Sequence, residues 1–175
     1  YNTATVAADD GSVPEDMFGG DQQSGAGVSG MFRTVRNPNL PKTEFGWEID
    51  PVGFRATLRE IDSRYHLPML ITENGLGAYD EISADGKVHD PYRIKYLKDH
   101  IEQMQEAITD GVSMLGYNPW SAIDLISTHE GMRKRYGFIY VDRDEFDLGT
   151  MKRIPKDSFY WYKKVIASNG DDLSE

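Results

Sequence analysis

The chain contains no cysteine among its 175 residues, which excludes disulfide bonds, thiolate metal sites and a cysteine nucleophile. It also has no apolar run approaching the roughly 20 residues that a transmembrane helix needs. No basic segment followed by an apolar segment opens the sequence, so no signal peptide is visible. The absence of cysteine suits an enzyme of the reducing cytoplasm. We therefore expect a cytoplasmic location.

Positive charge is also scarce, because 19 basic residues stand against 29 acidic ones and the formal net charge is −10. A field of that sign disfavours nucleic acid and anionic membrane surfaces as partners. An anionic ligand would need a local cluster of positive charge. The length is enough for one ordinary domain. Because the first residue is Tyr1 rather than methionine, we expect the chain to begin inside a longer polypeptide.

The apolar pattern predicts successive β/α units, the order that is typical of a parallel sheet. Two Asp-Pro pairs, at 50–51 and 90–91, combine a helix-capping acceptor with proline in the first turn, and apolar residues follow each at helical spacing. Three such units amount to about a third of a (β/α)8 barrel. The expected strands are the end of Tyr1–Val6, Pro68–Thr72, Val112–Trp120 and a short run at Gly137–Val141, and the last expected helix is Lys156–Ala167.

Residues 8–45 are expected to form a long loop that covers an active site or lies at the surface. Its first part, Ala8–Gly30, is rich in glycine, serine, aspartate and glutamine and has no periodicity. A flexible linker has the same composition, so both interpretations remain open.

Glu73 is the first candidate for chemistry. It directly follows the apolar run Pro68–Ile71 and Thr72, and Asn74-Gly75 then ends the run. In a parallel barrel the catalytic side chains lie at the C-terminal ends of the strands. A carboxylate placed there is a candidate nucleophile or general base in sugar chemistry. The alternative is a polar residue that merely opens a surface turn.

A second candidate site follows the third strand. Lys134 supplies a compact positive charge, while Ser127 and Tyr136 supply hydroxyl groups, so this segment is suited to an anion such as a phosphomonoester. The alternative is a charged run on a solvated surface. Trp120 ends the preceding strand and is suited to stacking on the apolar face of a sugar, although a lone tryptophan is more often part of the core.

Taken together, these segments resemble the C-terminal part of glycoside hydrolase family 1, in its 6-phospho-β-glucosidase branch. The resemblance implies that residues 1–175 are a C-terminal fragment of a single retaining (β/α)8 glycosidase barrel, comprising about its last three β/α units. It is carried by six segments in the right order: FGWEIDPVGFR at 45–55, ITENG at 71–75, DPYRIKYLKDHI at 90–101, YNPWSAIDLIS at 117–127, KRYGFIYVD at 134–142 and KDSFYWYKKVIASNG at 156–170.

The resemblance also implies roles for particular residues. Glu73 matches the nucleophile, and Trp120 matches the aromatic platform under the sugar. The three residues that match the grip on the 6-phosphate are Ser127, Lys134 and Tyr136. Tyr1 matches a tyrosine that hydrogen-bonds the nucleophile.

Substrate preference is implied by two further positions. Relatives that act on plain sugars have a Glu-Trp pair at the positions of Ser127 and Thr128, and replacing that glutamate with serine removes a charge that would repel phosphate. Thr128 in place of tryptophan resembles the gluco rather than the galacto branch. Glu130 could replace the missing glutamate under a shifted register, which leaves a plain β-glucosidase as an alternative.

One part of the expected chemistry is missing from the sequence. The acid/base of the family lies in an Asn-Glu-Pro motif, which this chain does not contain. We therefore expect the chain alone to be inactive, with a phosphorylated β-glucoside as substrate of the parent enzyme and no metal or cofactor. A non-catalytic module that binds sugar phosphates is the rival hypothesis. Open sheet edges would favour self-association of such a fragment.

Overall fold

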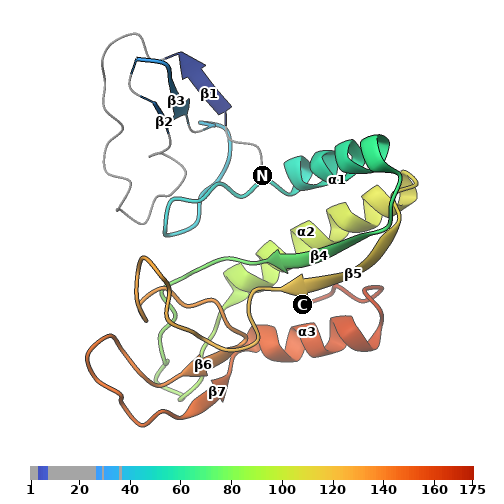
Figure 1. Cartoon of the computed structure of the whole chain (residues 1–175). Helices are drawn as coiled ribbons and strands as arrows, with labels where there is room; N and C mark the ends of the chain where they lie inside the picture. Colours follow the sequence, from blue (N-terminus) through green and yellow to red (C-terminus); the bar gives the residue numbers. More distant parts are fainter. Residues whose placement is uncertain (1–3, 8–26, 29, 36) are drawn as a thin grey trace.

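The computed structural model describes residues 4–7, 27–28, 30–35 and 37–175 (Figure 1). Its main body has two layers, in which three helices cover one face of a pair of parallel strands. The helices are α1 (Pro51–Tyr65), α2 (Pro91–Thr109) and α3 (Asp157–Ala167), and α2 packs against both of the others. None of the helices in the described part of the chain is long and apolar enough to cross a membrane.

The starts of α1 and α2 lie where the Asp-Pro pairs predict them. At α1 the Asp50 side chain accepts a hydrogen bond from the Gly53 amide at 2.8 Å, and the helix ends at His66 in the left-handed region. At α2 the predicted capping interaction is absent, because the Asp90 carboxylate accepts no hydrogen bond from the first amides of α2. It instead accepts hydrogen bonds from the amide and hydroxyl of Ser158, in the first turn of α3.

The parallel pair consists of β4 (Met69–Asn74) and β5 (Met114–Pro119), as the apolar runs predict. Asn74 pairs with Pro119, so both strands end at the same edge of the sheet. One face packs against the apolar residues of α1, α2 and the turn that follows α2. On the opposite face Leu70 and Leu115 are 49% and 71% exposed.

The first expected strand does not join this parallel sheet. Strand β1 (Ala4–Ala7) pairs antiparallel with β3 (Phe32–Val35), whose other edge pairs with β2 (Gly27–Val28). The described sheet thus has two parallel strands where three units were predicted. The expected 8–45 loop also contains β2 and β3, while residues 8–26 lie outside the described residues. The antiparallel pairing of β1 with β3 needs only a connecting loop, whereas joining the parallel sheet would require a crossover connection.

A third, small sheet lies beyond β5. Strand β6 (Ile139–Val141) confirms the short strand predicted at Gly137–Val141, and it pairs antiparallel with β7 (Arg153–Pro155), which the sequence did not predict. The chain passes directly from β7 into α3. The main apolar core lies between α2, α3 and the segments that follow β4 and β5.

A group of buried charged residues, here called the ionic cluster, lies beside this core. Lys156 is completely buried and contacts the carboxylates of Asp80 and Asp124, the latter at 2.8 Å. Burial lowers the pKa of Lys156, and the two carboxylates oppose that shift. The cluster has three carboxylates and three cations, so its formal charges balance: Asp80, Asp90, Asp124, Arg93, Arg135 and Lys156.

Replacing Lys156 with methionine should strongly destabilise the protein. The substitution keeps the side-chain length but leaves two buried carboxylates without their shared cation, and breaking a buried pair costs about 3–5 kcal/mol. Urea unfolding of the whole protein, followed by circular dichroism, measures the change. Lys163→Met is the matched control, because Lys163 is an exposed residue of α3 and should shift stability by less than about 0.5 kcal/mol. Equal stability of the two variants would contradict the importance of the cluster.

Candidate functional site

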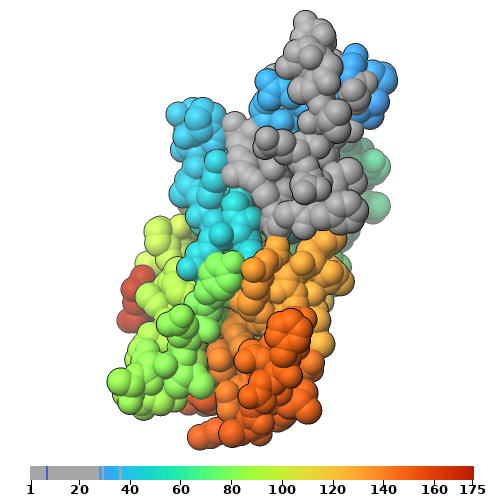
Figure 2. Space-filling view, turned by 90° about the vertical axis from the view of Figure 1, so that its left-hand side faces the viewer, coloured from blue at the N-terminus to red at the C-terminus, as the bar shows by residue number. Residues whose placement is uncertain are grey.

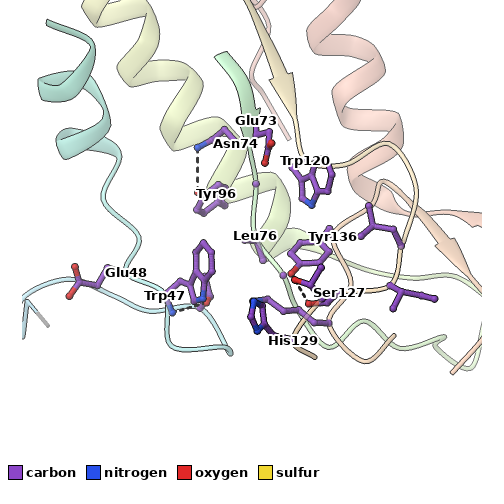
Figure 3. A pocket seen from close by; sticks show the side chains of 17 residues that line it. Trp47, Glu48, Glu73, Asn74, Leu76, Tyr96, Trp120, Ser127, His129 and Tyr136 are labelled. Atoms are coloured by element: carbon purple, nitrogen blue, oxygen red, sulfur yellow. Dashed lines mark hydrogen bonds between the residues drawn. The ribbon is translucent and has the colours of Figure 1, made fainter. Parts of the chain in front are cut away.

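A pocket of about 340 Å³ lies at the edge where β4 and β5 end (Figure 3). It receives side chains from the segment before α1, the end of β4, helix α2 and the segment after β5. Five of the six residues singled out from the sequence line it together, and the sixth, Tyr1, lies outside the described residues. The five are Glu73, Trp120, Ser127, Lys134 and Tyr136.

Glu73 is the penultimate residue of β4. It is exposed, and its side chain reaches the pocket. The strand end is fixed by the next residue, Asn74, which is buried. The side-chain oxygen Oδ1 of Asn74 accepts a hydrogen bond from the Tyr117 hydroxyl at 2.5 Å, and the side-chain nitrogen Nδ2 donates to the Tyr96 hydroxyl at 3.5 Å. The alternation of the strand then directs the neighbouring Glu73 side chain to the opposite face.

The ends of β4 and β5 approach each other closely. The Trp120 amide donates to the Asn74 carbonyl at 2.8 Å. A Cβ atom on Gly75 would lie only 2.0 Å from the Trp120 carbonyl oxygen, so glycine is required for this approach. The contact brings Trp120 and Glu73 into the same pocket. The Trp120 side chain is 39% exposed and meets Tyr136 edge-on at a centroid distance of 6.5 Å.

The hydroxyls of Ser127 and Tyr136 lie 3.1 Å apart, and Lys134 lines the same part of the pocket. The side chain of Lys134 is largely buried, and burial lowers the pKa of its ammonium group, with the charge of Glu130 opposing the shift. Burial likewise raises the pKa of Tyr136. The three side chains predicted to hold an anion therefore lie in one place.

Glu130 does not occupy the position that a shifted register would give it. Ser127 and Gly131 exchange two backbone hydrogen bonds, of 3.0 and 3.1 Å, which close a tight turn around Glu130. Its carboxylate pairs with Arg133, and Glu130 is not among the residues that line the pocket. In this arrangement the Glu130 side chain turns to Arg133 and does not line the pocket that holds Ser127.

Several pocket residues were not assigned from the sequence. Thr43, Trp47 and Glu48 come from the segment before α1, Tyr96 comes from α2, and His129 follows Ser127 (Figure 3). Trp47 and Glu48 belong to the FGWEID segment. A tryptophan shortly before the start of α1 was the feature of the sequence that could have marked them as pocket residues. Tyr96 occupies a position in the apolar stripe of α2, so its periodicity predicted only a core residue.

Comparison with known proteins identifies the family. The model of glycosyl hydrolase family 1 matches residues 1–171. The chain belongs to glycosyl hydrolase family 1. The aryl-phospho-β-D-glucosidase BglA of Bacillus subtilis is 53% identical over 175 residues, which are 99% of this chain and 35% of that protein. The 6-phospho-β-glucosidase AscB of Escherichia coli is 51% identical over 147 residues, which are 83% of this chain and 31% of that protein.

Solved structures of the family agree with the described fold. A family 1 β-glucosidase from Thermotoga maritima superposes with a TM-score of 0.75 at 43% identity, over 83% of this chain and 32% of that one. This confirms the expected α/β architecture as a part of a (β/α)8 glycosidase barrel. The family 1 chain spans about a third of the length of the relatives it matches.

Gly75→Ala should separate the two strand ends and disturb the pocket. The added Cβ would clash with backbone rather than with a flexible side chain, so we expect a loss of stability of about 1–3 kcal/mol and a changed fluorescence environment of Trp120. Urea unfolding and tryptophan fluorescence measure both effects. Gly116→Ala is the control in the same sheet, because its Cβ would meet only a Leu70 methyl at 3.3 Å. A Gly75 variant that matches this control would contradict the close approach.

Proposed function

We propose that the whole protein hydrolyses 6-phospho-β-D-glucosides with retention of configuration, and that this chain carries the nucleophile and the phosphate site. The observation that carries the proposal is that Glu73 and the Ser127–Lys134–Tyr136 group line one pocket. The relatives named above, which are phospho-β-glucosidases at 51–53% identity, support the same substrate class.

In the proposed reaction the Glu73 carboxylate attacks the anomeric carbon of the sugar. A bond forms between a carboxylate oxygen and this carbon while the bond to the leaving oxygen breaks, and a general acid protonates that oxygen. Water then hydrolyses the glycosyl ester and frees Glu73. Because these 175 residues contain no Asn-Glu-Pro motif, the acid/base comes from another part of the whole protein, about 5 to 5.5 Å from Glu73.

The phosphate group of the substrate accounts for the residue types at Ser127, Lys134 and Tyr136. The hydroxyls of Ser127 and Tyr136 donate hydrogen bonds, and the Lys134 ammonium adds a charge-assisted one. A carboxylate at position 127 would repel the phosphate, whereas serine does not. Bound phosphate also raises the pKa of Lys134 against the effect of burial, so substrate binding and lysine protonation favour each other.

Trp120 supplies the remaining contact in this proposal. Its ring lies between Glu73 and Tyr136 in the pocket, at the end of β5. An aromatic face there stacks on the apolar face of the sugar ring and excludes water from one side of it. The sugar is thereby held with its anomeric carbon towards Glu73 and its 6-phosphate towards Lys134.

Glu73→Gln should abolish turnover of an aryl 6-phospho-β-glucoside by the whole protein, because a neutral amide cannot form the glycosyl ester. Glu73→Ala combined with azide should restore release of the aryl group, because azide replaces the missing nucleophile and yields the α-glycosyl azide. Release rates and product stereochemistry by NMR provide the measurement. Glu81→Gln, at an exposed site on the next loop, is the control. Wild-type turnover in the Glu73→Gln variant would refute the assignment.

Lys134→Ala should raise KM for the phosphorylated substrate at least about tenfold, because a charge-assisted hydrogen bond contributes about 1.5–3 kcal/mol. The KM of the same aryl glucoside without phosphate should not change. Steady-state kinetics on the two substrates measure the difference. Lys152→Ala removes the same charge at an exposed site and controls for the long-range field. Equal losses on both substrates would give Lys134 a structural role instead.

A further inference from the structure

The ammonium group of Lys134 is surrounded by aromatic rings. Its Nζ atom lies 4.7 Å from the ring centroid of Trp47, 4.8 Å from that of Phe45 and 5.6 Å from that of Tyr136. The residue is only 5% exposed. Among the described residues, no side chain or carbonyl forms a hydrogen bond or ion pair with Nζ. We call Phe45, Trp47 and Tyr136 the aromatic cage.

A buried lysine without a carboxylate is unusual, since burying an unpaired charge is costly. The same chain contains the ordinary solution: Lys156, also buried, contacts the carboxylates of both Asp80 and Asp124. Glu130 is the acidic residue nearest in sequence to Lys134, and its carboxylate is engaged by Arg133. The two lysines therefore differ, because Lys156 is paired with two carboxylates whereas no carboxylate of the described residues forms an ion pair with Lys134.

The two outer rings of the cage come from a separate part of the chain. Phe45 and Trp47 precede α1, in a turn closed by a 2.8 Å bond from the Thr43 amide to the Trp47 carbonyl and a 3.1 Å bond from the Trp47 amide to the Thr43 hydroxyl. This turn docks on the segment that follows β4. In Figure 2 the cyan segment before α1 lies directly against the green one after β4.

Two contacts fix the docking. The Glu44 carboxylate accepts a hydrogen bond from the Tyr79 amide at 2.7 Å. The Phe45 ring packs on the Tyr79 ring at a centroid distance of 4.5 Å. Gly77, on the same segment, leaves room for the lysine stem, because a Cβ there would lie 2.5 Å from both Cγ and Cε of Lys134.

The physical difference between an aromatic cage and a carboxylate decides what Lys134 can do. Ring faces attract a cation through their quadrupole, most strongly where water is excluded, but they carry no net charge. A carboxylate would hold the ammonium equally well and would also cancel its attraction for an anionic ligand. The cage therefore orients the ammonium and leaves its charge for the ligand.

We propose that Phe45 and Trp47 are positioning residues that hold the charged Lys134 for the phosphate group of a sugar 6-phosphate. The inference rests on the proposed function for the identity of the ligand. It assigns to the segment before α1 a part in selecting phosphorylated substrates, in addition to the residues after β5. The rings touch Lys134, and their effect on the ligand is exerted through it.

The test compares Trp47→Leu with Trp47→Phe in the whole protein, using an aryl 6-phospho-β-glucoside and the same aryl β-glucoside. Trp47→Leu removes the ring and should raise KM for the phosphorylated substrate about tenfold, with little change in kcat and a much smaller rise in KM for the plain substrate. Trp47→Phe keeps a ring face and should restore most of the affinity. Phe146→Leu, at a fully exposed aromatic, is the control. Equal losses on both substrates would overturn the proposal, because the ring would then contact the sugar or the aglycone.

A second series excludes effects of shape or folding. Tryptophans with increasing numbers of fluorine atoms, introduced at position 47 alone, weaken the attraction of the ring face for cations with almost no change in size. The KM for the phosphorylated substrate should rise with each fluorine, and the pKa of Lys134, read by NMR of ¹³Cε-labelled lysine, should fall. A pKa and KM independent of fluorination would overturn the cage.

The same series separates the two proposals. If the wild-type protein shows no preference for the phosphorylated glucoside, the proposed function fails, and the pKa of Lys134 still reports on the cage. If the preference is present but fluorination at position 47 changes neither quantity, the cage fails and the proposed function stands.

Discussion

The balance of charge inside the ionic cluster is the constraint on which the rest of the described structure depends. Arg93 donates to Asp80 at 3.0 Å and to the Arg135 carbonyl at 3.1 Å, and Arg135 in turn contacts Asp124 at 3.2 Å. Asp124 also accepts a hydrogen bond from the Gly137 amide at 2.9 Å. Each charge of the cluster is paired, and Arg93, Arg135, Asp90 and Asp124 also bond to backbone groups, which offsets the cost of burying them.

The cluster joins four segments, three of which also contribute side chains to the pocket. Its members come from the loop after β4, the start of α2, the segment after β5 and the start of α3. Lys134 and Tyr136 flank Arg135, so the anchoring of Arg135 on one side fixes the two pocket residues on the other. Among the described residues, the buried cations thus fall into two groups. Arg93, Arg135 and Lys156 are neutralised within the cluster, whereas Lys134 lines the pocket.

Patterns within short stretches of sequence were enough to predict the helices and strands that depend on neighbouring residues. The Asp-Pro pairs placed α1 and α2, the apolar runs placed β4 and β5, and the carboxylate after one of these runs placed Glu73 at the pocket. The grouping of Ser127, Lys134 and Tyr136 was also predictable, because the three positions lie within ten consecutive residues of one loop.

Long-range pairings were not predictable in the same way. Asp90 carries the sequence signature of a helix cap, yet its carboxylate bonds to Ser158, 68 residues later. Strand β1 finds its partner in β3 across a segment without periodicity. Trp47 meets Lys134 only because the turn before α1 docks on the loop after β4. Each of these contacts depends on tertiary packing, for which the spacing of residues along the chain gives no signal.

The late position of Lys156 and Ser158 in the chain has a consequence for biosynthesis. Asp80, Asp90 and Asp124 are synthesised first, and each takes one of its several partners from those two residues. On the ribosome the cluster therefore holds three carboxylates against only two cations, Arg93 and Arg135, until Lys156 emerges. The charge balance around Arg135, which lies between the pocket residues Lys134 and Tyr136 in the chain, is therefore complete only when the start of α3 has been released.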